Sequence, residues 1–390
     1  MTPKTSTRPN HPVSVTEARL IVAASETDAN LLYATRFFAP DPFIFFIHDR
    51  RDYVVVSDLE IDRARQQARV HSVLSLSGYE QKLRKSGSRD PDTAAVLTRI
   101  FKDKGIRSVQ VPENFPLGLA AQLQESALRI RPCSGPFFPQ RELKTSEEIN
   151  EIRRVQRTAE AGVEAALQAL RECRIGRDGT LTWNGTKLTA EHLKHRIGLA
   201  ALEQDCVASH TIVACGGQGV DPHQEGHGLL KANQPIIIDV FPRSQVSGYW
   251  GDITRTLVKG RASERLKIQF QAVLKAQQLA LKTIRPGVTG CQVHQKVIDW
   301  FKNCGFTSGH LRGRMQGFFH GTGHGVGLEI HEAPRLSAKG GAPLRPGQVV
   351  TVEPGLYYSG VGGVRIEDLV VITQTGFRNL THLPKFLEIE

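Results

Sequence analysis

Short apolar segments alternate with amphipathic segments over the first third of the chain. The apolar segments are rich in β-branched and aromatic residues, which is typical of strands in a buried sheet. The predicted strands are 19–24, 42–48, 52–57, 108–111 and 128–131. Segments with helical spacing separate them, at 27–36, 61–70, 93–104 and 116–126. This alternation predicts an α/β domain that ends near residue 140.

A long amphipathic segment opens the second part of the chain. Its apolar positions recur with helical spacing, and Thr145 or Ser146 can cap a helix that runs to about residue 172. A helix that starts here marks a change of organisation. We therefore expect a first domain over residues 1–143 and a second domain over residues 144–390.

The second domain contains one arrangement twice, in which two helical segments precede a hairpin of two strands. The copies span residues 147–258 and 263–374. In the second copy the helices are expected at 263–284, where Pro286-Gly287 follows, and at 290–304. The repetition predicts two similar halves.

Each hairpin carries two carboxylates at nearly the same spacing. Asp239 and Asp252 are thirteen positions apart in the first hairpin, and Glu353 and Glu367 are fourteen positions apart in the second. They interrupt otherwise apolar strands, where an uncompensated carboxylate is costly to desolvate. We therefore expect a positively charged partner between them.

A glycine-rich segment with three histidines lies between the two hairpins. It reads His320-Gly-Thr-Gly-His324-Gly-Val-Gly-Leu-Glu-Ile-His331-Glu332, and its glycines let the backbone approach a crowded site. A single histidine or aspartate is more often structural than functional, but here several agree. Four carboxylates and one imidazole form a ligand set for two divalent metal ions. The carboxylates nearly neutralise two such ions and leave room for a bridging hydroxide.

Composition narrows the class of protein. The 390 residues carry a net charge of +11, but the basic residues are dispersed, so a generally basic surface is favoured over a nucleic-acid site. The sequence contains no apolar run of about eighteen residues, so no membrane span is expected. The polar first residues do not form a secretory signal. Six scattered cysteines without a CxxC pair indicate reduced thiols. These features predict a cytoplasmic protein.

Several segments together resemble the signature of the pita-bread metallopeptidases, in particular their Xaa-Pro aminopeptidase and Xaa-Pro dipeptidase (prolidase) branch. The segments are Asp239, Asp252-Ile-Thr-Arg-Thr, His320-Gly-Thr-Gly-His324, Val352-Glu353-Pro-Gly and Arg365-Ile-Glu367-Asp. The resemblance covers roughly residues 144–390. It implies an α+β pita-bread (creatinase/aminopeptidase) catalytic domain. The layout of the preceding α/β domain resembles the N-terminal domain of prolidases and creatinases.

The resemblance implies a dinuclear metal-dependent exopeptidase. Such an enzyme cleaves the Xaa-Pro bond at the N-terminus of peptides or in dipeptides, through a metal-bridging hydroxide. Asp252 and Glu367 would bridge the two ions, Asp239 would bind one of them, and His324 and Glu353 would complete the other. Manganese is the first expectation, with cobalt, zinc or iron as alternatives, because carboxylate-rich sites accept all four. The resemblance also implies a homodimer.

Further residues receive catalytic roles from the same resemblance. Glu353 would carry a proton to the leaving nitrogen, and His331 would support the oxyanion. His223 would contact the substrate, with His227 as the alternative. Arg365 is two residues before Glu367, hence on the same strand face, and is placed to orient the carboxylates.

Two departures from the family pattern leave alternatives open. Asp239 is followed by Val240-Phe241-Pro242-Arg243 where the family usually has a small residue and glycine, which could narrow the pocket or alter the substrate length. Arg335 is the only early basic residue after His331, so the choice between dipeptidase and aminopeptidase stays open. Another hydrolase or a lyase on the same fold (creatinase-like), or a non-catalytic binding module, are the competing functions. The first domain shows no catalytic constellation, and its histidines are expected to be structural or at the surface: His11, His48 and His71.

Overall fold

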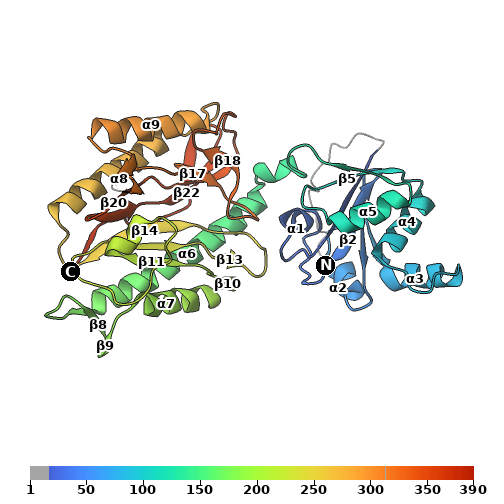
Figure 1. Ribbon diagram of the computed structural model, residues 1–390, viewed down its shortest axis with the longest axis horizontal. Helices are drawn as coiled ribbons and strands as arrows, with labels where there is room; N and C mark the ends of the chain where they lie inside the picture. Colours follow the sequence, from blue (N-terminus) through green and yellow to red (C-terminus); the bar gives the residue numbers. More distant parts are fainter. Residues whose placement is uncertain (1–16, 312) are drawn as a thin grey trace. The chain divides into compact units, whose positions relative to one another are not determined.

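The computed structural model describes residues 17–311 and 313–390. Two compact units divide the chain between Arg141 and Glu142 (Figure 1), two residues before the boundary expected from the sequence. His11 and the polar N-terminal segment lie outside the described residues. Among the described helices, none combines the length and apolar character that a membrane span requires.

A mixed six-stranded sheet forms the centre of the first unit, in the order β4-β3-β2-β1-β5-β6. Its strands are β1 (Ala18–Ala23), β2 (Phe43–His48), β3 (Arg51–Val56), β4 (Ser72–Ser75), β5 (Ser108–Val111) and β6 (Arg129–Pro132). The helices are α1 (Ala29–Thr35), α2 (Ile61–Gln67), α3 (Leu76–Lys85), α4 (Thr93–Lys104) and α5 (Leu117–Glu125). Strands β1 to β3 are antiparallel, whereas β4, β5 and β6 each join the sheet in parallel.

The predicted elements of this unit are confirmed, but two further elements were not expected. Strand β4 has only partly buried residues, and α3 has no fully buried residue. In α3 the apolar residues Leu76, Tyr79 and Leu83 recur with helical spacing and pack against the core, so the sequence did carry a signal for this helix. The core of the unit lies between α4 and the sheet, where Leu97 and Phe101 pack with Leu20 and Phe46.

Helices pack on the outer faces of the sheets of the second unit (Figure 1). They are α6 (Ser146–Glu172), α7 (Ala190–Leu202), α8 (Glu264–Thr283) and α9 (Gly290–Asn303). Helix α6 begins with a capping box, in which Thr145 accepts from the Glu148 amide and Glu148 accepts from the Thr145 amide. Thr145 is therefore the cap, rather than Ser146.

Two antiparallel half-sheets form the centre of this unit. The first has the order β11-β12-β14-β24, with β11 (Ile212–Cys215), β12 (Ile236–Val240), β14 (Ile253–Lys259) and β24 (Glu388–Ile389), the last pairing parallel to β14. The second has the order β18-β17-β19-β22-β23, with β17 (Gly323–Gly325), β18 (Glu332–Leu336), β19 (Val349–Val352), β22 (Asp368–Ile372) and β23 (Phe377–Asn379). One core packs α6 and α7 on the first half-sheet, and another packs α8 and α9 on the second. The predicted repetition of two helices and a hairpin is confirmed.

Shorter strands complete the unit. They are β7 (Arg174–Ile175), β8 (Leu181–Trp183), β9 (Thr186–Lys187), β10 (Cys206–Val207), β13 (Arg243–Ser244), β15 (Gly309–Leu311), β16 (Arg314–Gln316), β20 (Gly355–Tyr358) and β21 (Gly362–Arg365). Short 3-10 helices occur at Pro139–Glu142 and Gly216–Val220.

The second hairpin is interrupted where it carries its glutamates. Val352 pairs with Asp368 in β19–β22, and Gly355 pairs with Arg365 in β20–β21, so both segments share one register. Between them the pairing stops, at Glu353-Pro354 on one arm. Proline has no amide hydrogen and cannot donate to the ladder. The common register places Glu353 opposite Glu367.

The two hairpins meet at β14. The Glu367 amide donates to the Thr254 carbonyl at 3.1 Å, and the Arg365 amide donates to Thr256 Oγ1 at 2.9 Å. In the first hairpin Asp239 pairs with Thr254, and Asp252 lies two residues from Thr254 on the same face. The junction therefore brings the carboxylates of both hairpins together.

Candidate metal centre

The five predicted metal ligands line one cavity of about 830 Å³. Each is placed at or beside a strand of the two half-sheets: Asp239 in β12, Asp252 directly before β14, His324 in β17, Glu353 directly after β19 and Glu367 directly before β22. Asp252, Glu353 and Glu367 each lie directly before or after a strand. The strand fixes the backbone position of such a residue, although the residue itself is not paired with a neighbouring strand. The sheets therefore present the five side chains to one space.

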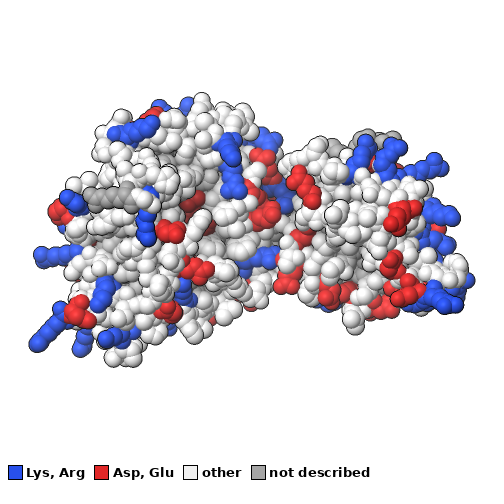
Figure 2. Space-filling view, in the orientation of Figure 1, with Lys and Arg blue, Asp and Glu red and all other residues white. Residues whose placement is uncertain are grey.

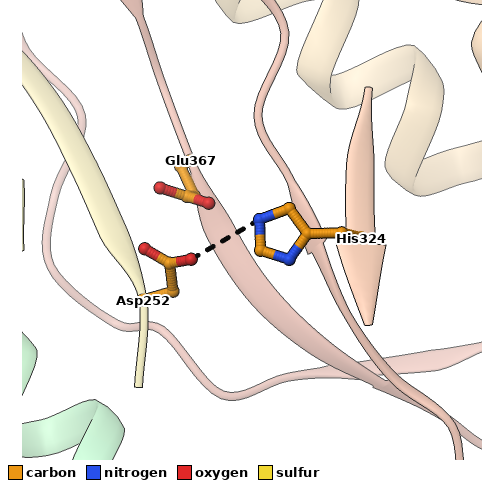
Figure 3. A group of neighbouring side chains, drawn as sticks. All are labelled: Asp252, His324 and Glu367. Carbon is orange, nitrogen blue, oxygen red and sulfur yellow. Dashed lines mark ion pairs between the residues drawn. The ribbon is translucent and has the colours of Figure 1, made fainter. Parts of the chain in front are cut away.

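Three of these side chains form a compact group of donor atoms. Asp252, His324 and Glu367 each offer one atom within 4.8 Å of the others (Figure 3). Glu353 extends the group, because its Oε1 lies 3.5 Å from His324 Nε2, which is 3.7 Å from Asp252 Oδ2. Asp239 lies in the same cavity wall.

The His324 ring points its Nε2 atom at carboxylate oxygens. Its Nδ1 lies 3.2 Å from the Gly325 carbonyl, which accepts a hydrogen bond from a protonated Nδ1. Burial, and then the neighbouring His331, lower the pKa of His324 to about 3, so the ring is neutral and Nε2 carries a lone pair. A lone pair facing carboxylates is unfavourable unless a cation lies between them. A histidine bound to a metal through Nε2 has this orientation.

The carboxylates also require a cation to remain charged. Burial raises the pKa of Glu353 to about 8, and burial with neighbouring carboxylates raises the pKa of Asp252 and of Glu367. Asp239 Oδ1 is buried and accepts no hydrogen bond from the described residues. Crowded carboxylates with an orphaned oxygen are typical of a site for divalent cations. The residues present therefore fit such ions.

A hydrogen-bonded chain that the sequence did not predict supports Asp239. Arg365 Nη2 donates to Asp239 Oδ2 at 2.7 Å, and Arg365 Nη1 donates to the Tyr357 hydroxyl at 2.9 Å. The hydroxyl in turn donates to His320 Nε2 at 2.9 Å. Arg365 thus donates directly to one of the four carboxylates, that of Asp239. Tyr357 carries no charge, and only its position four residues after Glu353 could have drawn attention to it.

Close backbone approaches explain two of the glycines around His324. A Cβ atom on Gly323 would lie 2.0 Å from the Thr351 carbonyl oxygen, and one on Gly325 would lie 2.1 Å from that of Ala333. Neither position tolerates a side chain. The glycines therefore allow β17 to hold His324 tightly between its two neighbouring strands.

Two of the three histidines with a predicted role toward the substrate lie on the cavity wall. His223 and His331 both line it and are exposed, and the His331 ring contacts the His324 ring with centroids 4.3 Å apart. His227 is not among the described residues that line the cavity; its amide donates to Gln218 Oε1. The geometry thus brings His223, rather than His227, to the ligands.

Aromatic and basic side chains complete the wall. Phe241 lines the cavity with Phe319, and Arg335 and Lys339 line it as well. Arg243 instead lies over the Trp250 ring, 5.9 Å from its centroid. On the face shown in Figure 2, acidic and basic side chains are interspersed over the second unit.

The sequence is similar to known peptidases. The sequence profile of metallopeptidase family M24 matches residues 150–374. A Xaa-Pro dipeptidase of Pyrococcus horikoshii is 30% identical over 281 residues, which cover 71% of this chain and 74% of that relative. An uncharacterized peptidase of Bacillus subtilis is 41% identical over 181 residues, 46% of this chain, and the match spans about half (48%) of that relative.

Solved structures resemble the whole described fold. An X-Pro aminopeptidase from Thermotoga maritima superposes with a TM-score of 0.79 at 25% identity, covering 96% of this chain and 98% of that one. A Xaa-Pro dipeptidase from Bacillus anthracis gives a TM-score of 0.80 at 25% identity, covering 96% and 95%. These matches confirm the pita-bread fold of the second unit. The family match identifies a metallopeptidase, a class of enzyme that uses divalent metal ions. The chain belongs to metallopeptidase family M24.

Proposed function

We propose that this chain is a metal-dependent exopeptidase that hydrolyses the Xaa-Pro bond at the N-terminus of peptides or in dipeptides. The observation that carries the proposal is the convergence of four carboxylates and one neutral imidazole in a single cavity. The printed names of the Pyrococcus horikoshii and Thermotoga maritima proteins support the Xaa-Pro specificity.

In this proposal two divalent ions, with manganese as the first choice, are held by Asp239, Asp252, His324, Glu353 and Glu367. When bound, such ions polarise the substrate carbonyl and lower the pKa of a water molecule. Cobalt, zinc or iron are alternatives, since carboxylate-rich sites accept all of them.

The residues of the chain supply the remaining steps. Glu353 lies directly after β19 and lines the cavity, where its carboxylate takes a proton from the attacking water and delivers it to the proline nitrogen. His331 donates a hydrogen bond to the carbonyl oxygen as negative charge develops there. His223 lines the same cavity and contacts the substrate, and Arg365 holds Asp239 in place through its 2.7 Å hydrogen bond.

Two cationic side chains favour the dipeptidase form of this activity. Arg335 and Lys339 line the same cavity as the ligands, and a dipeptide has a free carboxylate close to the bond that is cleaved. An aminopeptidase substrate has a further peptide bond at that place. We therefore expect Ala-Pro to be a better substrate than Ala-Pro-Ala.

Product analysis of Ala-Pro and Ala-Pro-Ala by chromatography, with each of the four metals, tests the proposal. Release of alanine from Ala-Pro supports it, and absence of cleavage of both peptides with every metal refutes it. In the variant Arg335→Leu we expect KM to rise more for Ala-Pro than for Ala-Pro-Ala. An equal rise for both peptides would show that Arg335 does not bind the dipeptide carboxylate.

Two further properties belong to the same proposal. We propose a homodimer, which light scattering at micromolar concentration tests, because a monomeric mass would contradict it. We also propose a reducing, cytoplasmic location, supported by cysteines that form no disulfide: Cys133, Cys173, Cys206, Cys215, Cys291 and Cys304.

A further inference from the structure

Two buried glutamine side chains hold the backbone beside the proposed metal ligands. Gln156 comes from α6 and Gln277 from α8, the first helix of each half, and both are 0% exposed. Figure 1 shows these helices running along the strands of the unit. A buried amide is costly unless it is hydrogen-bonded, so the partners of these side chains indicate what they do.

Gln277 bridges the interruption in the second hairpin. Its Nε2 donates to the Val352 carbonyl at 3.1 Å and to the Ile366 carbonyl at 3.3 Å. These residues directly precede Glu353 and Glu367, at the point where the pairing between the two arms stops. One side-chain amide thus connects both arms at the interruption, where the backbone contributes a long hydrogen bond from the Ile366 amide to the Pro354 carbonyl at 3.5 Å.

The other end of Gln277 shows that this bridge is retained at a cost. Its Oε1 is buried and accepts no hydrogen bond from the described residues. An orphaned acceptor in a core is unfavourable, and an apolar side chain of similar length would avoid it. The donor function of Nε2 therefore accounts for a glutamine at this position.

Gln156 holds Asp252 in the same way from the other half. Its Oε1 accepts from the Asp252 amide at 2.8 Å, and its Nε2 donates to the Asp252 carbonyl at 2.9 Å. The side chain thus pairs with this residue as a neighbouring strand would. Gly251 permits the close approach, because a Cβ atom there would lie 2.8 Å from the Val155 carbonyl oxygen.

We propose that Gln156 and Gln277 are positioning residues for the metal centre. They fix the peptide units that carry Asp252, Glu353 and Glu367, so the carboxylates are held in place before a metal ion binds. This inference rests on the proposed function, because it assumes that these carboxylates are ligands. Loss of either amide should therefore weaken metal binding in the folded protein. This weakening should exceed that of a variant which loses similar stability at a place away from the ligands.

The chain offers a matched control for Gln277. Gln269 lies on the same helix, is 1% exposed, and donates through Nε2 to two carbonyls of the same hairpin, at 2.7 Å and 3.1 Å. Those carbonyls belong to Leu356 and Gly362, in the part of the hairpin beyond the glutamates. Methionine has similar length and no donor, so Gln269→Met and Gln277→Met remove the same interactions at different places.

The test compares cobalt binding to the metal-free parent, Gln269→Met and Gln277→Met. Visible absorption and competition with a chelator give the dissociation constants, and urea unfolding gives the stabilities. We expect roughly tenfold weaker binding and an altered cobalt spectrum in Gln277→Met, as for other residues that orient ligands. Gln269→Met should lose similar stability and keep parental binding within about twofold. Gln156→Met should resemble Gln277→Met.

Equal binding losses in the two α8 variants, or unchanged binding in Gln277→Met, would overturn the inference. If Gln277→Met does not fold, Gln277→Asn tests the same contact, because its amide is too short to reach both carbonyls. A failure of the metal site itself is distinguishable: the parent would then bind no cobalt, or Glu367→Gln would bind as much as the parent.

Discussion

Replacing Tyr357 with phenylalanine removes a single hydroxyl from the hydrogen-bonded chain beside the metal centre. That hydroxyl accepts from Arg365 Nη1 and donates to His320 Nε2, each at 2.9 Å. The ring is fully buried and packs with Ile237 and Phe319, contacts that phenylalanine keeps. The substitution therefore isolates the two hydrogen bonds.

The magnitude follows from the two partners. A hydrogen bond to a charged group contributes about 1.5–3 kcal/mol and one between neutral groups about 1 kcal/mol. Arg365 is the charged partner, and it keeps its bond to Asp239. His320 is the neutral partner, because burial and then Arg365 lower its pKa to about 3. We expect the free energy of unfolding to fall by about 3 kcal/mol.

Tryptophan fluorescence during urea unfolding measures this loss in the second unit alone. All three tryptophans of the chain, Trp183, Trp250 and Trp300, lie in that unit. The control is Tyr358→Phe, since the Tyr358 hydroxyl is bonded only to the Thr307 carbonyl among the described contacts and its loss should cost below about 1 kcal/mol. Equal losses in the two variants would refute the reasoning.

Three further outcomes are expected. His331→Ala should lower kcat about a hundredfold while the metal content, measured by elemental analysis, stays unchanged. The control His227→Ala should keep the parental kcat. Normal turnover by folded His331→Ala would contradict the proposed role of His331. Lys144→Met leaves the buried Glu332 carboxylate without this ammonium and should destabilise by about 3 kcal/mol or more in urea, with partial recovery on adding Glu332→Gln. Burial lowers the pKa of His294 below 6.5, so the unfolded chain binds a proton at this residue more tightly than the folded chain, and the stability falls as the pH drops below 6.5. In His294→Gln this decline should be less steep. An unchanged dependence of the unfolding free energy on pH, measured by urea titration, would exclude this contribution.

Strong local signals in the sequence were sufficient for most elements. The helix expected at 93–104 has those bounds, because Asp92 accepts from the Ala95 amide at its start and Gly105 ends it in the left-handed region. The second hairpin was predicted from its two apolar arms, and the interruption at Glu353-Pro354 was not part of that prediction. Pro354 was visible in the sequence and could have indicated the break.

The candidate ligands could be predicted because charged residues in apolar strands are conspicuous. Their supporting residues could not. Tyr357, Gln156 and Gln277 are uncharged. Their partners are distant in the sequence: Arg365 is 8 positions from Tyr357, Val352 is 75 positions from Gln277, and Asp252 is 96 positions from Gln156. Such partners are set by the packing of helices on sheets, which a single sequence does not display.

The division of the proposed ligands between two similar halves has a consequence for unfolding. The first half contains Asp239 and Asp252, and the second contains His324, Glu353 and Glu367. Each half has its own hydrophobic core, so an ion held by residues of both halves would be lost when either core unfolds. Bound metal would therefore stabilise both halves together.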